Sequence, residues 1–336
     1  MNPWLLLLLL IPIGLAGLWT LLVFRTAWYL THPNPRHTPK GYAPDFDPSV
    51  LGLEPVQIES RTGMTLKAWI ARPKHHPASV ILCHGVWTNH KEMVGRCVEL
   101  LKLGYGVVLF DFSGHGESEG STTTMGYREM LDLLGVVDWA ADQVELGRLA
   151  VWGNSMGGSV AIMAAALDER LEAVIADSPF ATLRENVARA FKRITGLPPW
   201  LFVGPVVWLG QRLVGHRMDH IRPVDLVASL HSRPLMVVQS GQDSIVSAES
   251  TRKLFEAATS AEKHLWVIDE AEHVEGFHIL RDEYLAKISE FLRHSLRDPV
   301  EKQFSRDGGR RKAAGDLKLR RGDAPGAPRS APTPKH

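Results

Sequence analysis

The hydrophobic residues of this chain form one long run at its start and then many short runs separated by polar segments. The long run, from Trp4 to Phe24, contains no charged residue. As a helix it would be roughly 30 Å long, which matches the hydrocarbon core of a bilayer. A cleaved signal peptide normally has a basic start and a shorter apolar core, and no Lys or Arg precedes this run. The pattern therefore predicts an uncleaved transmembrane anchor over residues 1–30.

The residues that follow the anchor indicate its orientation. Arg25, Arg36 and Lys40 come after the apolar run. Positive charge beside a span is typical of its cytoplasmic side. This favours a single-pass membrane protein with its body in the cytoplasm. Proline and turn-forming residues dominate 31–50, which we interpret as a linker.

Short apolar runs alternate with helical patterns in the body of the chain. The runs 55–59 and 64–71 predict a hairpin. Further strands are expected within 79–85, 105–112, 148–155, 171–180, 233–243 and 264–273. Apolar strands that alternate with helices are typical of a mostly parallel sheet with helices on both faces. In such α/β sheets, active sites form at the carboxyl ends of the strands.

Composition and charge separate the body from the C-terminal segment. A chain of 336 residues that is 45% hydrophobic can bury a large core. The net charge is only +1, but residues 301–336 carry ten Lys and Arg against four Asp and Glu. This segment is also rich in Pro, Gly and Ala, so we expect 298–336 to be a disordered basic tail. A solvated extension is favoured over a nucleic-acid or membrane-surface arm, and no nucleic acid is expected as a partner. Two cysteines, Cys83 and Cys97, make neither a disulfide framework nor a metal site.

One glycine-rich segment carries the candidate chemistry. Gly153-Asn154-Ser155-Met156-Gly157 follows a predicted strand and opens a predicted helix, the context that a G-x-S-x-G nucleophile elbow requires. Small residues on both sides of Ser155 let strand and helix approach, and the helix N-terminus offers free N–H groups where negative charge develops. A plain tight turn is the alternative. We favour Ser155 as a catalytic nucleophile.

A serine hydroxyl needs a general base and a group that orients the base. Asp243 and His273 follow the last two predicted strands, so the three residues come in the order Ser, Asp, His. Asp243 could instead cap the next helix. Asp177, at the end of the preceding strand, is the rival acid, and His278, at the start of the last helix, is the rival base.

A third segment, His84-Gly85-Val86-Trp87, follows the first of the parallel strands. The backbone N–H of Val86 could join that of Met156 in a two-donor oxyanion hole. Trp87 could take the place of Val86. We expect His84 to brace this loop by hydrogen bonding rather than to transfer protons.

With these motifs, the chain over residues 51–297 resembles the α/β-hydrolase superfamily, specifically membrane-anchored bacterial hydrolases of the serine aminopeptidase-like and Bem46-like groups. The glycine-rich loop Asp111-Phe-Ser-Gly-His-Gly-Glu-Ser118 belongs to the same resemblance. The resemblance implies an eight-stranded, mostly parallel sheet, with the first hairpin as its antiparallel part. It implies that the glycine-rich loop is structural. Val86 and Trp87 depart from the small or proline-containing residues usual after the His-Gly, which implies a narrower acyl site.

Superfamily members commonly insert a cap where residues 180–232 stand. An apolar cap over a cleft would favour hydrophobic esters or amides. The apolar segment 196–215 could equally pack onto the core or dip into the bilayer interface.

Together these features predict a membrane-anchored serine hydrolase, esterase- or lipase-like, that cleaves an ester, thioester or amide of a hydrophobic acyl substrate. No cofactor or metal is required. A serine peptidase shares the same chemistry, and a non-catalytic membrane scaffold that uses the basic tail is the alternative outside the enzymes.

Overall fold

The computed structural model describes residues 3–33 and 48–296. Most of the predicted linker at 31–50, and the whole of the predicted tail at 298–336, lie outside the described residues.

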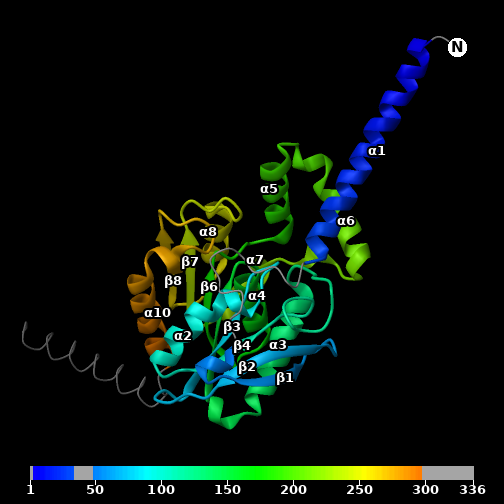
Figure 1. Ribbon diagram of the computed structural model, residues 1–336. Coiled ribbons are helices and arrows are strands. Elements are labelled where there is room, and N and C mark those ends of the chain that lie inside the picture. The colour runs from blue at the N-terminus through cyan, green and yellow to red at the C-terminus, as the bar shows by residue number, and fades with distance from the viewer. Residues whose placement is uncertain (1–2, 34–47, 297–336) are drawn as a thin grey trace, which may run out of the picture. The chain divides into compact units, whose positions relative to one another are not determined.

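Eight strands form a single sheet in the order β1-β2-β4-β3-β5-β6-β7-β8 (Figure 1). Only the pairings of β2, with β1 and with β4, are antiparallel, and all other neighbours are parallel. The strands are β1 (Glu54–Glu59), β2 (Thr65–Ala71), β3 (Ala78–Cys83), β4 (Gly106–Phe110), β5 (Arg148–Asn154), β6 (Leu171–Asp177), β7 (Leu235–Ser240) and β8 (Lys263–Ile268). The predicted fold class, an α/β-hydrolase sheet with a leading antiparallel hairpin, is confirmed.

Helices cover both faces of this sheet because its central strands are apolar on both sides. In β5, Val151 packs into the cluster with α3 and α4, while Ala150 and Trp152 pack into the cluster with α2 and α10. The helices of the body are α2 (Val94–Lys102), α3 (Tyr127–Ala141), α4 (Met156–Leu167), α8 (Ala248–Ala257), α9 (Gly276–Ile279) and α10 (Arg281–Ser295). Short 3-10 helices lie at η1 (Pro48–Leu51), η2 (His90–Met93) and η3 (Val144–Leu146).

A helical insertion connects β6 to β7, within the segment predicted to be a cap. Its two longer helices are amphipathic and bury only one face each. It consists of α5 (Leu183–Thr195), η4 (Pro199–Leu201), α6 (Val203–Val214), η5 (Met218–His220), α7 (Pro223–Leu226) and η6 (Val227–Leu230).

The N-terminal helix α1 (Pro3–Thr31) runs beside α6 (Figure 1). Its last turns are packed, with Val23, Ala27 and Leu30 buried in the cluster that also contains the apolar face of α6. The side chains from Leu10 to Leu21 are exposed. Among the described residues, the segment Leu10–Thr31 is long and apolar enough to cross a membrane.

The C-terminal end of α1 also touches the loop that follows β3. The rings of Tyr29 and Trp87 lie 4.7 Å apart, and the Thr123 N–H donates to the Thr31 carbonyl at 2.9 Å. The end of α1 is therefore held by the body of the protein on two sides.

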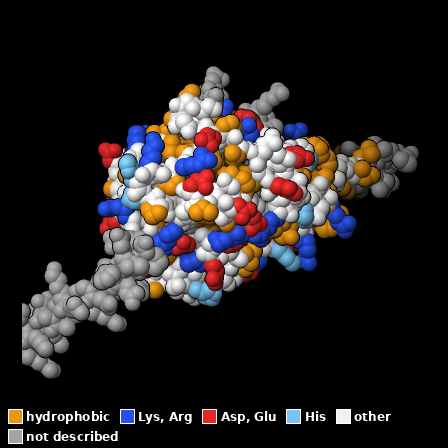
Figure 2. Space-filling view, turned by 90° about the horizontal axis from the view of Figure 1, so that it is seen from below, with side chains coloured by type: hydrophobic (Ala, Val, Ile, Leu, Met, Phe, Trp, Pro, Cys, Tyr) orange, Lys and Arg blue, Asp and Glu red, His pale blue; other side chains and the backbone are white. Residues whose placement is uncertain are grey.

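Figure 2 shows basic and acidic side chains interspersed over the face of the body that is seen from below. Among the ion pairs is Arg61–Asp138 at 2.7 Å, with both side chains about two-fifths exposed (39% and 45%). Exposed pairs of this kind contribute little to stability, so the two apolar clusters on the sheet provide most of it.

The packing of α3 on β1 gives a test of the fold. A Cβ on Gly135 would lie 2.7 Å from the Glu59 carbonyl oxygen and 2.8 Å from the Ser60 Cα. We expect Gly135→Ala to lower the free energy of unfolding by about 1–3 kcal/mol, because backbone must move to make room. Thermal and urea unfolding of the full chain in detergent measure this change.

Gly204 in α6 is the matched control, since its nearest neighbour would be the Arg184 guanidinium at 3.7 Å. Gly204→Ala should be neutral or stabilising by up to about 1 kcal/mol. Equal losses from both substitutions would contradict the packing.

Candidate active site

Ser155 lies at the sharp turn from β5 into α4, with φ 52° and ψ −115°. Few residues other than glycine adopt such a positive φ, and it stores strain. A Cβ on Gly153 would lie 2.2 Å from the Gly157 carbonyl oxygen, and a Cβ on Gly157 would lie 2.4 Å from the Cys83 carbonyl oxygen. The glycines therefore allow the helix to start against two strands and hold Ser155 at the edge of the sheet.

The structure brings the three sequence-predicted residues together. His273 Nε2 is 2.9 Å from Ser155 Oγ, and His273 Nδ1 is 2.7 Å from Asp243 Oδ2. The Asp243 side chain is 4% exposed and that of His273 is 16% exposed, so the line of contacts is largely shielded from solvent.

The loops after β7 and β8 fix the positions of Asp243 and His273. The N–H groups of Ile245 and Val246 both donate to Asp243 Oδ1 at 2.8 Å, which leaves Oδ2 for His273. The Gly241 N–H donates to the Ile268 carbonyl at 2.8 Å, which ties one loop to the other strand. The fixed carboxylate in turn fixes the ring of His273.

The cap also contacts the loop of the acid. The Arg189 guanidinium on α5 donates to the backbone carbonyl of Asp243 at 3.0 Å. A movement of α5 would therefore reach the acid through its backbone.

The two rival residues have other surroundings. Asp177 accepts hydrogen bonds from Arg96 at 3.2 Å and from the Tyr284 hydroxyl at 2.7 Å, deep in the protein. His278 lies in the short helix α9, separate from α10, and burial lowers its pKa. Asp243 and His273 make the contacts described above.

The loop after β3 lies against Ser155. A Cβ on Gly85 would be 3.5 Å from the Ser155 Cβ. The Gly85 N–H is not free, because it donates to Glu92 Oε2 at 2.7 Å. Met156 is the first residue of α4, where a backbone N–H has no partner within the helix. Val86 follows Gly85 in this loop and Met156 follows Ser155, and their role as oxyanion donors stays a prediction.

His84 braces this loop through both ring nitrogens. Nδ1 lies 2.7 Å from the Gly85 carbonyl oxygen, and Nε2 accepts the Phe112 N–H at 3.1 Å. Burial, together with the nearby His115, lowers the pKa of His84 to about 3, so the ring is neutral. A neutral ring that donates at Nδ1 and accepts at Nε2 fits both contacts.

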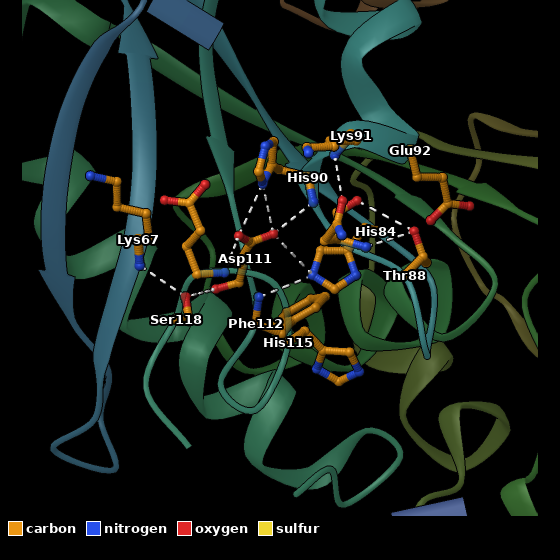
Figure 3. Close-up of polar contacts among 12 residues, drawn as sticks. Lys67, His84, Thr88, His90, Lys91, Glu92, Asp111, Phe112, His115 and Ser118 are labelled. Carbon is orange, nitrogen blue, oxygen red and sulfur yellow. Dashed lines mark hydrogen bonds and ion pairs between the residues drawn. The ribbon is translucent and has the colours of Figure 1, made fainter. Parts of the chain in front are cut away.

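The glycine-rich loop 111–118 is organised by the Asp111 carboxylate (Figure 3). Asp111 accepts from the His90 backbone N–H at 2.6 Å and from the Glu117 N–H at 2.9 Å. A Cβ on Gly116 would lie 2.1 Å from this carboxylate. These contacts give the loop a structural role beside His84.

Glu92, a residue that the sequence patterns did not single out, is buried between Gly85 and Asn154. Its Oε1 accepts from the Asn154 side-chain amide at 3.2 Å, and burial raises its pKa against the opposing effect of the Gly85 N–H. Arg96, also not singled out, has its guanidinium 4.6 Å from the centre of the Phe277 ring. Both residues stand in a pattern that reads as an ordinary amphipathic helix, so the sequence offers no signal for their roles.

Among the described residues, no group of three or more His, Cys, Asp or Glu side chains could hold a metal ion.

Comparisons with known proteins agree with this fold. The profile of the X-Pro dipeptidyl-peptidase (S15) family matches residues 62–199. The chain is 28% identical to the Bacillus subtilis protein YqkD, over 73% of this chain and 80% of that protein. It is 32% identical to the lysophosphatidylserine lipase ABHD12 of Rattus norvegicus, over 48% of this chain and 41% of the lipase. The structure of the Pyrococcus furiosus esterase Pf2001 superimposes with a TM-score of 0.65 at 28% identity, over 79% of this chain and all of the esterase.

The eight-stranded sheet, the strained serine turn and these similarities define the class of protein. The chain belongs to the α/β-hydrolase superfamily. It is a serine hydrolase, and its esterase-like fold implies a small-molecule substrate.

The neutral, buried His84 gives a prediction on acid stability. The unfolded chain binds a proton at this imidazole near pH 6.5, whereas the folded chain binds it near pH 3. Unfolding therefore takes up a proton between these values, and the free energy of unfolding falls as the pH falls, by about 1.4 kcal/mol per pH unit for this group. We expect His84→Gln to show a shallower slope between pH 6.5 and 3, measured by urea unfolding at several pH values. Parallel slopes for the two proteins would refute this origin of the acid sensitivity.

Proposed function

We propose that this chain is a membrane-anchored hydrolase that cleaves the ester of a hydrophobic acyl substrate through Ser155, His273 and Asp243. The observation that carries the proposal is the unbroken line of contacts from Ser155 Oγ through His273 to Asp243, at 2.9 Å and 2.7 Å.

In the first half of the reaction, His273 Nε2 removes the Ser155 proton while Oγ attacks the substrate carbonyl. Asp243 accepts from Nδ1–H, which keeps the free lone pair at Nε2 and stabilises the imidazolium that forms. His273 then gives the proton to the leaving alcohol, and an acyl-enzyme remains on Ser155.

Negative charge develops on the carbonyl oxygen during this step. The backbone N–H groups of Val86 and Met156 are the donors that we assign to it, the second strengthened by the N-terminus of α4. In the second half, His273 takes a proton from water as the water oxygen attacks the acyl carbonyl. His273 then returns this proton to Ser155 Oγ as the Oγ–acyl bond breaks and the acid leaves.

An acyl substrate from the membrane fits the surroundings of the site. The similarity to a lysophosphatidylserine lipase supports a lipid-like ester, and the insertion helix α5 contacts the loop of Asp243 through Arg189. We therefore favour esters with a long acyl chain over small polar ones.

The packing of α1 supports its retention as an anchor. A signal sequence that is cleaved off does not contribute to the core of the mature protein. Here Val23, Ala27 and Leu30 of α1 lie in the core cluster. Arg25, Arg36 and Lys40 after the apolar run support a cytoplasmic body.

A serine peptidase is the second candidate, because the S15 family profile matches residues 62–199. An aminopeptidase needs an acidic group near the nucleophile to hold the substrate amine. Glu92 lies close to Ser155, but its two oxygens already accept from Gly85 and Asn154. This arrangement favours the esterase.

The role of Ser155 is tested by a fluorophosphonate probe. We expect covalent labelling of the full chain in detergent, and loss of both labelling and esterase activity in Ser155→Ala, because only an activated serine attacks the probe. Mass spectrometry of the labelled peptide identifies the site. A folded wild-type chain that stays unlabelled would exclude the proposed chemistry.

A panel of p-nitrophenyl esters of increasing length, beside peptide p-nitroanilides, separates the two candidates. We expect kcat/KM to rise with chain length and the peptides to be poor substrates. Preferred cleavage of the peptides would show that the chain is a peptidase and not an esterase. The proposed roles of Ser155, Asp243 and His273 would stay the same.

The role of Asp243 is tested by Asp243→Asn. The new amide would donate to His273 Nδ1, so the ring proton would sit on Nε2. A protonated Nε2 cannot accept the Ser155 proton. We expect kcat to fall by roughly 10³–10⁴-fold. Asp269→Asn, on the exposed neighbouring loop, is the matched control and should keep its activity. Similar activities of the two variants would show that Asp243 is not the orienting group.

A further inference from the structure

The turn between α5 and α6 presents large apolar side chains to the outside. We define the cap tip as residues 194–201. Within it Ile194 is 75% exposed and Trp200 is 77% exposed, with Leu197 and Leu201 about two-fifths exposed (39% and 42%). Exposing such a cluster to water is unfavourable in free energy, and contiguous exposed apolar side chains mark an interaction surface.

The cap tip lies next to the part of α1 that is exposed. The ring of Phe202, the residue after the tip, lies 6.2 Å from the ring of Trp19 on α1. Farther along, from Val23 onward, α1 buries one face through Val23, Ala27 and Leu30. The tip is thus continuous with the apolar surface of the N-terminal helix.

The length of α1 sets how close a bilayer must come to the body. The unpacked part of α1, from Trp4 to Leu21, has 18 residues and is about 27 Å long. A hydrocarbon core is about 30 Å thick. Trp19 also lies about 9 Å before Arg25, the first charged residue of the helix. A core that begins at Trp4 therefore extends past Leu21, so its boundary lies beyond the level of Trp19 and Phe202 and leaves no spacer between membrane and cap.

The charges around the tip match an anionic lipid surface. Lys192 and Arg193 are exposed in the last turn of α5, directly before Ile194. Apolar and aromatic side chains beside basic ones are typical of segments that lie in a membrane interface.

We propose that the cap tip is a second membrane contact, in which Ile194, Leu197, Trp200 and Leu201 insert into the same bilayer leaflet that α1 enters and the basic side chains bind anionic headgroups. This inference rests on the anchoring part of the proposed function. It commits to lipid as the occupant because the tip stands at the depth where α1 enters the hydrocarbon.

Insertion of the tip places the cap, and with it the candidate active site, at the source of a lipid-like substrate. Since α5 reaches from the tip to the Asp243 carbonyl through Arg189, one rigid helix joins the membrane contact to the loop of the acid. A substrate that leaves the bilayer at the tip would meet the cap before it meets water.

The depth of the tip is measured with single labelled cysteines in the full chain. The native Cys83 and Cys97 are fully buried, so a thiol-reactive fluorophore that senses its environment would attach at an introduced site. The three sites are Trp200→Cys in the tip, Ile13→Cys in the exposed part of α1, and Val144→Cys on the far side of the fold as a water-exposed control. The labelled proteins are reconstituted into vesicles of phosphatidylcholine with a minority of phosphatidylglycerol.

We expect brominated lipids to quench the labels at 13 and 200, and aqueous iodide to quench only the label at 144. A label at 200 that iodide quenches as it does at 144, while that at 13 remains in lipid, overturns the inference and leaves the anchor intact. A label at 200 shielded from both quenchers indicates a protein contact and also overturns it. If iodide quenches the label at 13, both the inference and the anchoring fail, whereas the hydrolytic chemistry is untouched.

An activity measurement tests the consequence. The double variant Ile194→Ser, Trp200→Ser should lose severalfold activity toward a long-chain ester embedded in vesicles and keep its activity toward a short soluble ester. Val144→Ser is the control for both substrates. Equal activity of the double variant and wild type on the embedded ester would remove the functional role of the contact.

Discussion

The close approach of α4 to the ends of β3 and β5 is the constraint on which the site depends. Side chains at Gly153 or Gly157 would overlap backbone carbonyl oxygens, so the helix could not begin at this angle. The approach forces Ser155 into a left-handed backbone conformation, which costs about 1–3 kcal/mol. The apolar packing on both faces of the sheet maintains this strained turn, and the turn directs the hydroxyl toward His273.

A buried polar network behind the serine fixes the loop opposite it. Glu92 holds the Gly85 N–H on one side and the Asn154 amide on the other, and so joins the loop after β3 to the end of β5. His84 fastens the same loop to the residue after Asp111. Because the Gly85 N–H is already occupied, we assign the oxyanion of the proposed reaction to the next amide, that of Val86. The network holds the loop that carries this proposed donor.

The sequence predicted much of the fold because its signals are local. The continuous apolar strands, their alternation with helical patterns and the glycines around Ser155 all follow from short-range rules, and the sheet has the expected form. The order of Ser155, Asp243 and His273 along the chain, each after a strand, was enough to place them at one edge. The contacts of Glu92, Arg96 and Arg189 could not be predicted, since each joins segments distant in sequence and each residue stands in an unremarkable helical pattern. The packing of α1 on α6 could not be predicted for the same reason. The sequence of an apolar helix indicates its length but not which of its faces packs against the rest of the protein.

The contact of Tyr29 with Trp87 means that the N-terminal helix is more than a tether. Its final turn is part of the wall around the loop that carries the assigned oxyanion donor. A shortened protein made by deleting the helix would lose that wall together with the proposed membrane anchor. Such a protein would be a different catalyst, and its kinetics would not describe the chain with the helix in place.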